Sequence, residues 1–288
     1  MTGSREGTAR RNLDSTIIPG RPPKASGPGR AALIVSLATL AAACGRGGDW
    51  RTPAASSQSA AAAEASYAQP PRFTAAARLG DGDVEIVGRA HRNAQVRLTS
   101  PDGSSLAALT DSRGAFSVDM PRPQAVRLFG LAEDIAGRQV RGVGYLAVVP
   151  SPGQAAVVLR AGTGAEALAA PSGAAKITAV DFDVSGLTVV SGLAKPGSVL
   201  KVTVDGAGGA EARANTQGRY TLTLTTALKA GQHDLVVQSP LGQAEARFRV
   251  SPAGPISGLP FRAARQSNGW RIDWLTPAGG EQTTLVID

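Results

Sequence analysis

Residues that could do acid–base or metal chemistry are few and scattered along this chain of 288 residues. The two histidines, His91 and His233, have no other histidine and no cysteine near them in the sequence. A zinc site needs three or four such ligands, so no metal site is predicted. His233 precedes Asp234, but no Gly-x-Ser-x-Gly segment supplies the nucleophile that a serine hydrolase of this type requires.

Three further motifs match catalytic or calcium-binding patterns only in part. Ser198 and Lys201 have the spacing of a Ser-x-x-Lys pair, but the segment alternates like a strand, which points the two side chains to opposite faces. The Asp-x-Asp pairs at 81–83 and 181–183 do not continue into a calcium-binding loop, and turn formation explains them better. With no phosphate loop or dinucleotide fingerprint either, we predict no catalytic residue, no cofactor and no enzyme.

One pair of side chains has the spacing of a binding surface. Trp270, Ile272 and Trp274 alternate with Arg271 and Asp273, so both tryptophans face the same side of a predicted strand. Tryptophan is common at binding hot spots, and the pair could form a platform for a sugar ring or a partner protein. The alternative is core packing, because tryptophan buries a large area. Trp270 and Trp274 are therefore the candidate binding residues, with the core alternative left open.

The N-terminal segment is typical of an export signal. Residues 1–30 are polar and basic, and residues 31–43 form an uncharged apolar run that ends at Cys44, the only cysteine. The run is too short for a membrane span, which needs ~20 residues. Arg10 and Arg11 resemble a twin-arginine signal, but they lie far from the apolar run. We predict that residues 1–43 are a signal peptide with a long basic leader.

Leu40-Ala41-Ala42-Ala43-Cys44 resembles the lipobox of bacterial lipoproteins. The resemblance implies that Cys44 is diacylated and becomes the mature N-terminus. The chain departs from the pattern at Ala41, where leucine is usual. Ala41 and Ala43 also suit ordinary signal peptidase cleavage, so secretion to the periplasm without a lipid is the alternative. Gly45 stands where aspartate would retain a lipoprotein at the inner membrane, which implies the outer membrane in a Gram-negative organism.

A turn sequence occurs twice further along the chain. Asp111, Gly114 and Phe116 recur as Asn215, Gly218 and Tyr220 at a constant offset of 104 residues. Asx at the first position can accept hydrogen bonds from the following backbone, and glycine three residues later can take a positive φ, as in a type I turn with a bulge. The aromatic residue two positions on then points into a core. The repeat predicts two similar domains.

Short runs with β character surround both copies of the turn, which predicts an all-β fold. We expect two tandem β-sandwiches and a small C-terminal β-meander, preceded by the signal peptide and a disordered tether. The expected boundaries are 44–72 for a lipid-anchored flexible tether, 73–161 for the first sandwich, 162–175 for a linker on which the domains pivot, 176–252 for the second sandwich and 253–288 for the meander.

The motifs of the two copies resemble known β-sandwich families. Gly88-x-Ala90 and Thr110 to Phe116 resemble the carboxypeptidase regulatory-like, transthyretin-like sandwich, and Gly192 to Val199 with Asn215 to Tyr220 resembles a bacterial immunoglobulin-like domain. These families mostly supply spacers, adhesive modules and assembly platforms. The resemblance implies a fold, and it carries over no catalytic residue.

The net charge of +8 is divided evenly between the leader and the rest of the chain. Residues 1–43 carry six basic and two acidic residues, which leaves 24 basic and 20 acidic residues after them. That excess is too small and too scattered for nucleic acid. We therefore expect a non-enzymatic cell-envelope lipoprotein, anchored to the membrane at Cys44, whose sandwiches are structural or bind an envelope protein. The alternative is binding of peptidoglycan or another envelope polysaccharide by Trp270 and Trp274.

Overall fold

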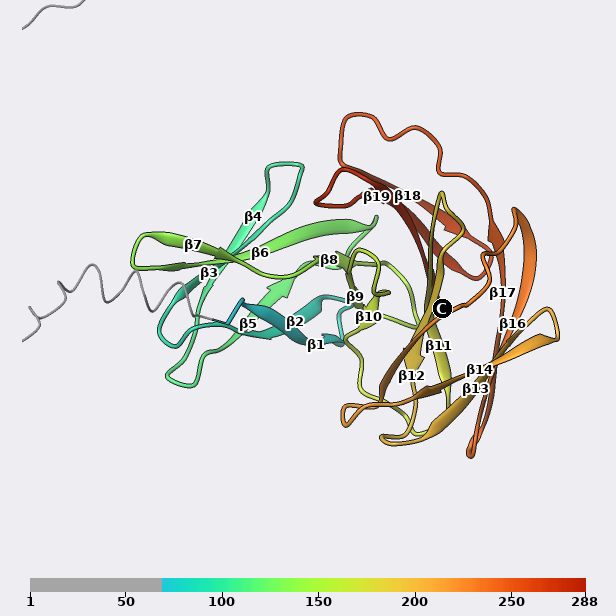
Figure 1. Ribbon diagram of the computed structural model, residues 1–288. Coiled ribbons are helices and arrows are strands. Elements are labelled where there is room, and N and C mark those ends of the chain that lie inside the picture. Colours follow the sequence, from blue (N-terminus) through green and yellow to red (C-terminus); the bar gives the residue numbers. More distant parts are fainter. Residues whose placement is uncertain (1–68) are drawn as a thin grey trace, which may run out of the picture. The chain divides into compact units, whose positions relative to one another are not determined.

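The structure is a computed structural model that describes residues 69–288 (Figure 1). These residues form strands joined by turns and loops, with no helix among them, and all of them belong to one compact unit. The predicted all-β class is therefore confirmed. Cys44, the predicted signal peptide and the predicted tether up to residue 68 lie outside the described residues. Within residues 69–288 no helix is long and apolar enough to cross a membrane.

The first sandwich is made of two antiparallel sheets, which we call the first and second sheets. The first sheet has the order β1-β2-β5, and the second has the order β10-β9-β8-β6-β3-β4 with β7 paired to β6. Their strands are β1 (Arg72–Arg78), β2 (Val84–Arg89), β3 (Gln95–Thr99), β4 (Ser105–Leu109), β5 (Ala115–Met120), β6 (Arg127–Ile135), β7 (Arg138–Arg141), β8 (Tyr145–Val148), β9 (Ala156–Leu159) and β10 (Glu166–Ala167).

The second sandwich is made of the third and fourth sheets. The third sheet has the order β15-β12-β11-β20-β19-β18, and the fourth has the order β14-β13-β16-β17. Their strands are β11 (Lys176–Asp183), β12 (Thr188–Leu193), β13 (Val199–Val204), β14 (Ala207–Arg213), β15 (Arg219–Thr223), β16 (Gly231–Ser239), β17 (Gly242–Val250), β18 (Phe261–Gln266), β19 (Gly269–Leu275) and β20 (Glu281–Ile287).

Both copies of the repeated turn have the predicted geometry. Gly114 and Gly218 take φ values of 76° and 72°, and each donates its backbone N–H to the carbonyl three residues earlier. The Oδ1 atom of Asp111 accepts two backbone N–H groups, and Oδ1 of Asn215 does the same. Phe116 lies in the core of the first sandwich and Tyr220 in the core of the second. The internal repeat is therefore a structural repeat.

The two cores also share one close packing device. A Cβ at Gly88 would collide with the ring of Phe116, and a Cβ at Gly192 would collide with the ring of Tyr220. In each sandwich the aromatic ring lies over a glycine of the neighbouring strand, where β2 pairs with β5 and β12 pairs with β15. Only glycine leaves room for this approach, which explains why both positions lack a side chain.

The predicted C-terminal meander is part of the second sandwich. β20 pairs with β11 over Ala179 to Asp183, so β18, β19 and β20 extend the third sheet by three strands. The chain crosses from β17 in the fourth sheet to β18 in the third through residues 251–260. The third sheet therefore has six strands and offers a broad surface for packing on each of its two faces.

Residues 162–175 do not form a free linker. They contain β10, which pairs with β9, and Ala165 within them is fully buried. The backbone N–H of Ala165 donates to Oδ2 of Asp181 at 2.7 Å. The expectation that this segment lets the sandwiches pivot is wrong, because its backbone is bonded to strands on both sides.

A third apolar cluster, which we call the junction, lies between the second and third sheets. The first two clusters fill the two sandwiches, whereas the junction joins one sandwich to the other. Its buried members are Val126, Leu128, Ala147, Val149, Val157, Leu159, Ala165, Ala179, Ile272, Trp274 and Val286. Both faces of the third sheet are therefore covered.

Candidate functional site

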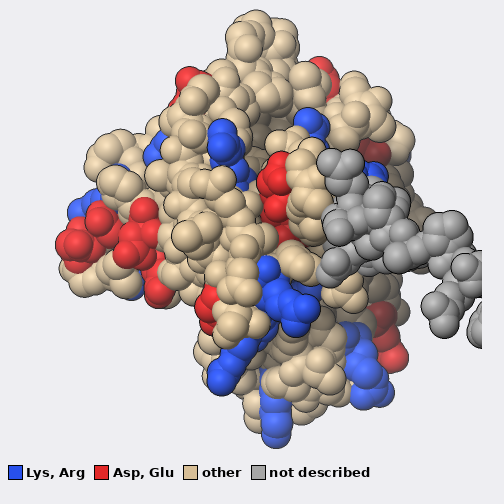
Figure 2. All heavy atoms as spheres, turned by 90° about the vertical axis from the view of Figure 1, so that its left-hand side faces the viewer, with Lys and Arg blue, Asp and Glu red and all other residues tan. Residues whose placement is uncertain are grey.

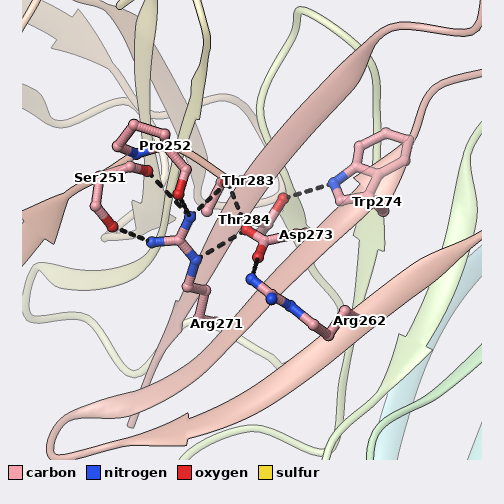
Figure 3. Close-up of polar contacts among 8 residues, drawn as sticks. All are labelled: Ser251, Pro252, Arg262, Arg271, Asp273, Trp274, Thr283 and Thr284. Atoms are coloured by element: carbon pink, nitrogen blue, oxygen red, sulfur yellow. Dashed lines mark hydrogen bonds and ion pairs between the residues drawn. The ribbon is translucent and has the colours of Figure 1, made fainter. Parts of the chain in front are cut away.

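Strand β19 carries the two predicted binding residues, and its alternating side chains lie in two different environments. Trp274 lies in the junction and is 0% exposed. Its ring meets the ring of Tyr145 edge to face, with centroids 6.0 Å apart, and its Nε1–H donates to Oγ1 of Thr284 at 3.1 Å (Figure 3). A buried indole offers no face to a sugar ring, so Trp274 cannot serve as half of an aromatic platform.

Trp270 lies on the same side of β19, as the alternation predicted, but it is half-buried and packs against the rim of the junction. The guanidinium of Arg265 lies over its ring, 5.9 Å from the ring centroid. Its Nε1 is buried and has no hydrogen-bond partner. The two tryptophans therefore share a face of β19, and that face packs on the first sandwich. For Trp274 the alternative prediction of core packing is correct.

The opposite side of β19 carries a buried ion pair that the alternation did not suggest. Arg271 is 8% exposed and Asp273 is 1% exposed, and Nε of Arg271 lies 2.8 Å from Oδ1 of Asp273. Oδ1 also accepts the hydroxyl of Thr283 at 2.7 Å, and Oδ2 accepts Arg262 at 2.6 Å (Figure 3). Strict alternation would place these charges in solvent, but Arg271 lies under the chain that crosses after β17 and over the ring of Phe182.

The crossing segment after β17 covers Arg271. One terminal nitrogen of Arg271 donates to Oγ of Ser251, and the other donates to the carbonyls of Ser251 and Pro252 at 3.0 and 3.1 Å. Beside this cluster is a cavity of about 180 Å³ lined by Phe182, Val250, Ser251, Pro252 and Thr283, among others. Every charged group of the cluster is satisfied within the chain, so the cluster holds the crossing segment in place and has no group left for chemistry.

A second buried carboxylate lies on the junction side of the third sheet. Asp181 on β11 is 1% exposed and has no cationic partner; its Oδ1 accepts the hydroxyl of Thr284 at 2.5 Å and the amide of Gln282 at 3.2 Å. Burial raises the pKa of Asp181 to about 6, although the hydrogen bonds from Thr284, Ala165 and Gln282 each lower it. Thr284 links Asp181 to Trp274, since its hydroxyl oxygen accepts from the indole and donates to the carboxylate.

This raised pKa makes stability depend on pH in a defined direction. The folded protein binds a proton at Asp181 near pH 6, and the unfolded chain binds it near 3.8, so between these values the native state holds more protons. The free energy of unfolding therefore rises as the pH falls through this window, by on the order of 3 kcal/mol for a shift of about two pKa units. We expect wild type to gain stability relative to Asp181→Asn between pH 7 and pH 4.5 in urea unfolding. Parallel pH profiles of the two proteins would contradict this assignment.

Arg219 fastens the second sandwich to the first. It occupies the repeat position of Ala115, directly after the turn glycine. Its Nε donates to the carbonyl of Ala167 at 2.9 Å, and one terminal nitrogen donates to the carbonyl of Thr74 on β1 at 3.1 Å. Glu166 accepts the other terminal nitrogen at 3.2 Å and also pairs with Arg160. The position that holds Ala115 in the first copy therefore holds Arg219 in the second, and Arg219 connects the two sandwiches.

The loop between β8 and β9 makes a second polar connection across the junction. The side-chain amide of Gln154 donates to the carbonyls of Thr178 and Ile287 at 2.7 and 2.9 Å. The hydroxyl of Ser151 in the same loop donates to the carboxylate of Asp288. These bonds lie beside the apolar junction and bring both strands β11 and β20 against the first sandwich.

His233 has a carboxylate beside it, which sequence reasoning did not find. Its Nδ1 lies 2.8 Å from Oδ2 of Asp205, and its Nε2 lies 2.8 Å from the carbonyl of Lys229. Burial acts to lower the pKa of His233, but these two hydrogen bonds raise it above its usual value. Because both ring nitrogens face acceptors, the imidazole closes the loop before β16 and has no free nitrogen to act as a base.

The other motifs that resembled catalytic or metal sites have structural roles. Asp81 and Asp183 accept backbone N–H groups two residues on and so close turns, as predicted. Lys201 is exposed on β13, and Ser198 precedes that strand in a turn with Lys195. In the part of the chain that the structure describes, no three His, Cys, Asp or Glu side chains gather closely enough to hold a metal ion.

Comparison with known proteins gives a likeness in fold alone. No family model matches the chain, and no curated protein matches it. Among solved structures, the chain is similar to "Biofilm associated protein - BSP domain", with 14% identity, a TM-score of 0.23, and coverage of 65% of this chain and 30% of that one. It is also similar to "Central Fibronectin-III array of RIM-binding protein", with 15% identity, a TM-score of 0.24, and coverage of 76% and 86%.

The chain spans about 30% of the biofilm-associated structure. Identities and TM-scores this low carry no argument about what the chain binds. The protein is therefore defined by its own architecture, as a tandem β-sandwich module. The finer transthyretin-like and immunoglobulin-like resemblances stay predictions.

Proposed function

We propose that the protein is a non-enzymatic lipoprotein of the cell envelope, in which acylated Cys44 anchors a structural or protein-binding β-sandwich module. The observation that carries the proposal is the position of Cys44, the only cysteine, directly after the apolar run of residues 31–43. The resemblance of Leu40 to Cys44 to a lipobox favours an acyl anchor over plain secretion to the periplasm. Gly45 favours the outer membrane.

The described residues support a module without catalytic activity. Five polar side chains stand out because they are buried or make several hydrogen bonds. They are Asp181, Arg219, His233, Arg271 and Asp273. Each is occupied by partners within the chain, and each connects strands or loops. Because Trp274 is buried, polysaccharide binding by a two-tryptophan platform loses its basis, and a protein partner is the better candidate.

Replacement of Cys44 tests the proposal in cells. In a Gram-negative host, Cys44→Ala is expected to abolish incorporation of labelled fatty acid and to move the protein from the membrane fraction to the soluble fraction. Wild type should carry the label. The measurement is fractionation followed by fluorography and immunoblotting.

A second variant separates acylation from sorting. Gly45→Asp keeps the cysteine and supplies the residue that retains lipoproteins at the inner membrane. It should stay labelled and shift from the outer to the inner membrane fraction. An unlabelled wild-type protein in the soluble fraction would refute the lipoprotein proposal.

A further inference from the structure

The exposed face of the first sheet has like charges opposite each other at both ends. Arg72 on β1 is directly paired with Arg89 on β2, and Glu85 on β2 is directly paired with Asp119 on β5. All four side chains are on the outer side of the sheet, since the alternate residues Phe73, Val84, Ile86 and Val118 are buried in the core. Like charges that face each other across strands destabilise a sheet. Folding alone therefore does not explain this segregation.

The arginine end of the sheet continues into two neighbouring turns. Arg89 donates to the carbonyl of Arg113 at 3.3 Å, and Arg92 lies in the turn after β2. The two turns touch, because the N–H of Asn93 donates to the carbonyl of Asp111. We call Arg72, Arg89, Arg92 and Arg113 the basic end; all four are exposed. Figure 2 views the side of the molecule on which this end lies, and Lys and Arg predominate in the lower part of that face.

Few carboxylates offset this charge. Asp111 is the one acidic residue within the two turns, and backbone N–H groups of Ala115 and Arg113 lower its pKa, with smaller contributions from the charges of Arg113 and Arg89. Nearby, Glu133 is buried and Asp134 is exposed with Oδ1 bonded to the N–H of Gly137. No ion pair joins any of the four arginines to a carboxylate of the described residues. The four arginines and Asp111 together carry a net charge of +3, and Glu166 lines a hollow beside Arg72.

The chain reaches the folded module at this same end. Arg72 is the first residue of β1, and 27 residues separate it from Cys44. Even at full extension, 27 residues span at most about 95 Å, so an acyl group on Cys44 would hold the basic end within that distance of the bilayer. The acidic pair of Glu85 and Asp119 lies at the other end of the sheet, away from the point of entry. The basic end of the sheet is therefore the end where the chain from the anchor enters. An anionic membrane surface at the anchor would attract this end.

We infer that the basic end is a docking surface for the anionic phospholipid headgroups of the membrane that holds the anchor. This inference rests on the proposed function, since the anchor brings the surface into reach. Each basic side chain near an anionic bilayer contributes about 1 kcal/mol of attraction, so four of them give binding that is weak in solution but strong once the chain is tethered. The face of the first sandwich that carries the basic end would then lie against the membrane.

Vesicle binding of an unanchored protein tests the surface without the anchor. The mature chain from residue 44, carrying Cys44→Ala, is mixed with vesicles of phosphatidylcholine and phosphatidylglycerol or of phosphatidylcholine alone. We expect sedimentation with the anionic vesicles at low salt, loss of binding at high salt, and none with the neutral vesicles. Arg72→Glu with Arg113→Glu should weaken binding at least about 30-fold, from two lost attractions of about 1 kcal/mol each.

A matched control carries the same change in net charge elsewhere. Lys195→Glu with Arg249→Glu alters two exposed cations of the second sandwich and should bind as the parent does. Arg72→Glu faces Arg89 and replaces a repulsion by an attraction, whereas Arg113→Glu places a like charge beside Asp111. The melting temperature of the double variant, measured beside its binding, separates lost binding from lost folding.

Equal weakening in both double variants would show a nonspecific effect of net charge. No binding to anionic vesicles would overturn the docking surface. Binding that requires a wall polymer or another protein would assign the basic end to that partner and would also overturn it. None of these outcomes changes whether Cys44 is acylated in cells, so the two proposals fail separately.

Discussion

Replacing Trp274 with alanine is expected to lower the free energy of unfolding by about 3–5 kcal/mol. The indole is 0% exposed, packs edge to face on Tyr145, and donates its only N–H to Thr284. Truncation would leave a large cavity between the second and third sheets and would free the Thr284 hydroxyl that holds Asp181. The measurement is urea unfolding followed by circular dichroism, which does not depend on the tryptophan that is removed.

Trp270→Ala is the matched control for this prediction. The same residue type four positions earlier on the same face of β19 is half-buried, and its N–H has no partner to lose. We expect less than half the destabilisation of Trp274→Ala. Because the junction joins the sandwiches, Trp274→Ala should also split a single unfolding transition into two. Equal small losses in both variants would show that the junction contributes little to stability.

Replacing Asp273 with alanine is expected to cost about 3–5 kcal/mol, because it would leave a buried guanidinium without its counter-charge. Arg271 is 8% exposed and bonded to the crossing segment, so it cannot turn into solvent without breaking the contacts to Ser251 and Pro252. Thermal and urea unfolding measure the loss.

The control for Asp273 is an exposed ion pair on the same sandwich. Asp234 and Arg247 are 58% and 68% exposed and lie 2.6 Å apart. Asp234→Ala should change stability by less than about 1 kcal/mol, because solvent screens an exposed pair. If Asp234→Ala destabilises as much as Asp273→Ala, burial is not what sets the strength of the Arg271–Asp273 pair.

Local chemistry made the turns and most strands predictable from sequence. Asp111 and Gly114, repeated as Asn215 and Gly218, form a turn from contacts within five residues, so no tertiary information is needed. β1 has the sequence Arg72-Phe73-Thr74-Ala75-Ala76-Ala77-Arg78, which has little β propensity, and it is a strand through its pairing with β2. Propensity is a weak guide where pairing supplies the stability.

The junction could not be predicted because it depends on how distant strands meet. Trp270, Ile272 and Trp274 alternate as predicted. The alternation shows that they share one face of the strand, but it does not show whether that face is exposed or covered by another sandwich. Arg271 and Asp273 have the pattern of a solvent-exposed face, but the residues after β17 cross over Arg271, and Phe182 packs against it. The sequence likewise predicts a turn at Asp181, whereas the residue lies in β11, where β20 pairs beside it.

The most direct test is the intact mass of the mature protein isolated from its native membranes. Both predicted cleavage routes leave Cys44 at the N-terminus, so the acyl group decides between them. We predict that the N-terminal peptide begins at Cys44 and carries the added mass of a diacylglyceryl group. A chain that begins at an unmodified Cys44, or at any other residue without a lipid, would contradict the anchored module.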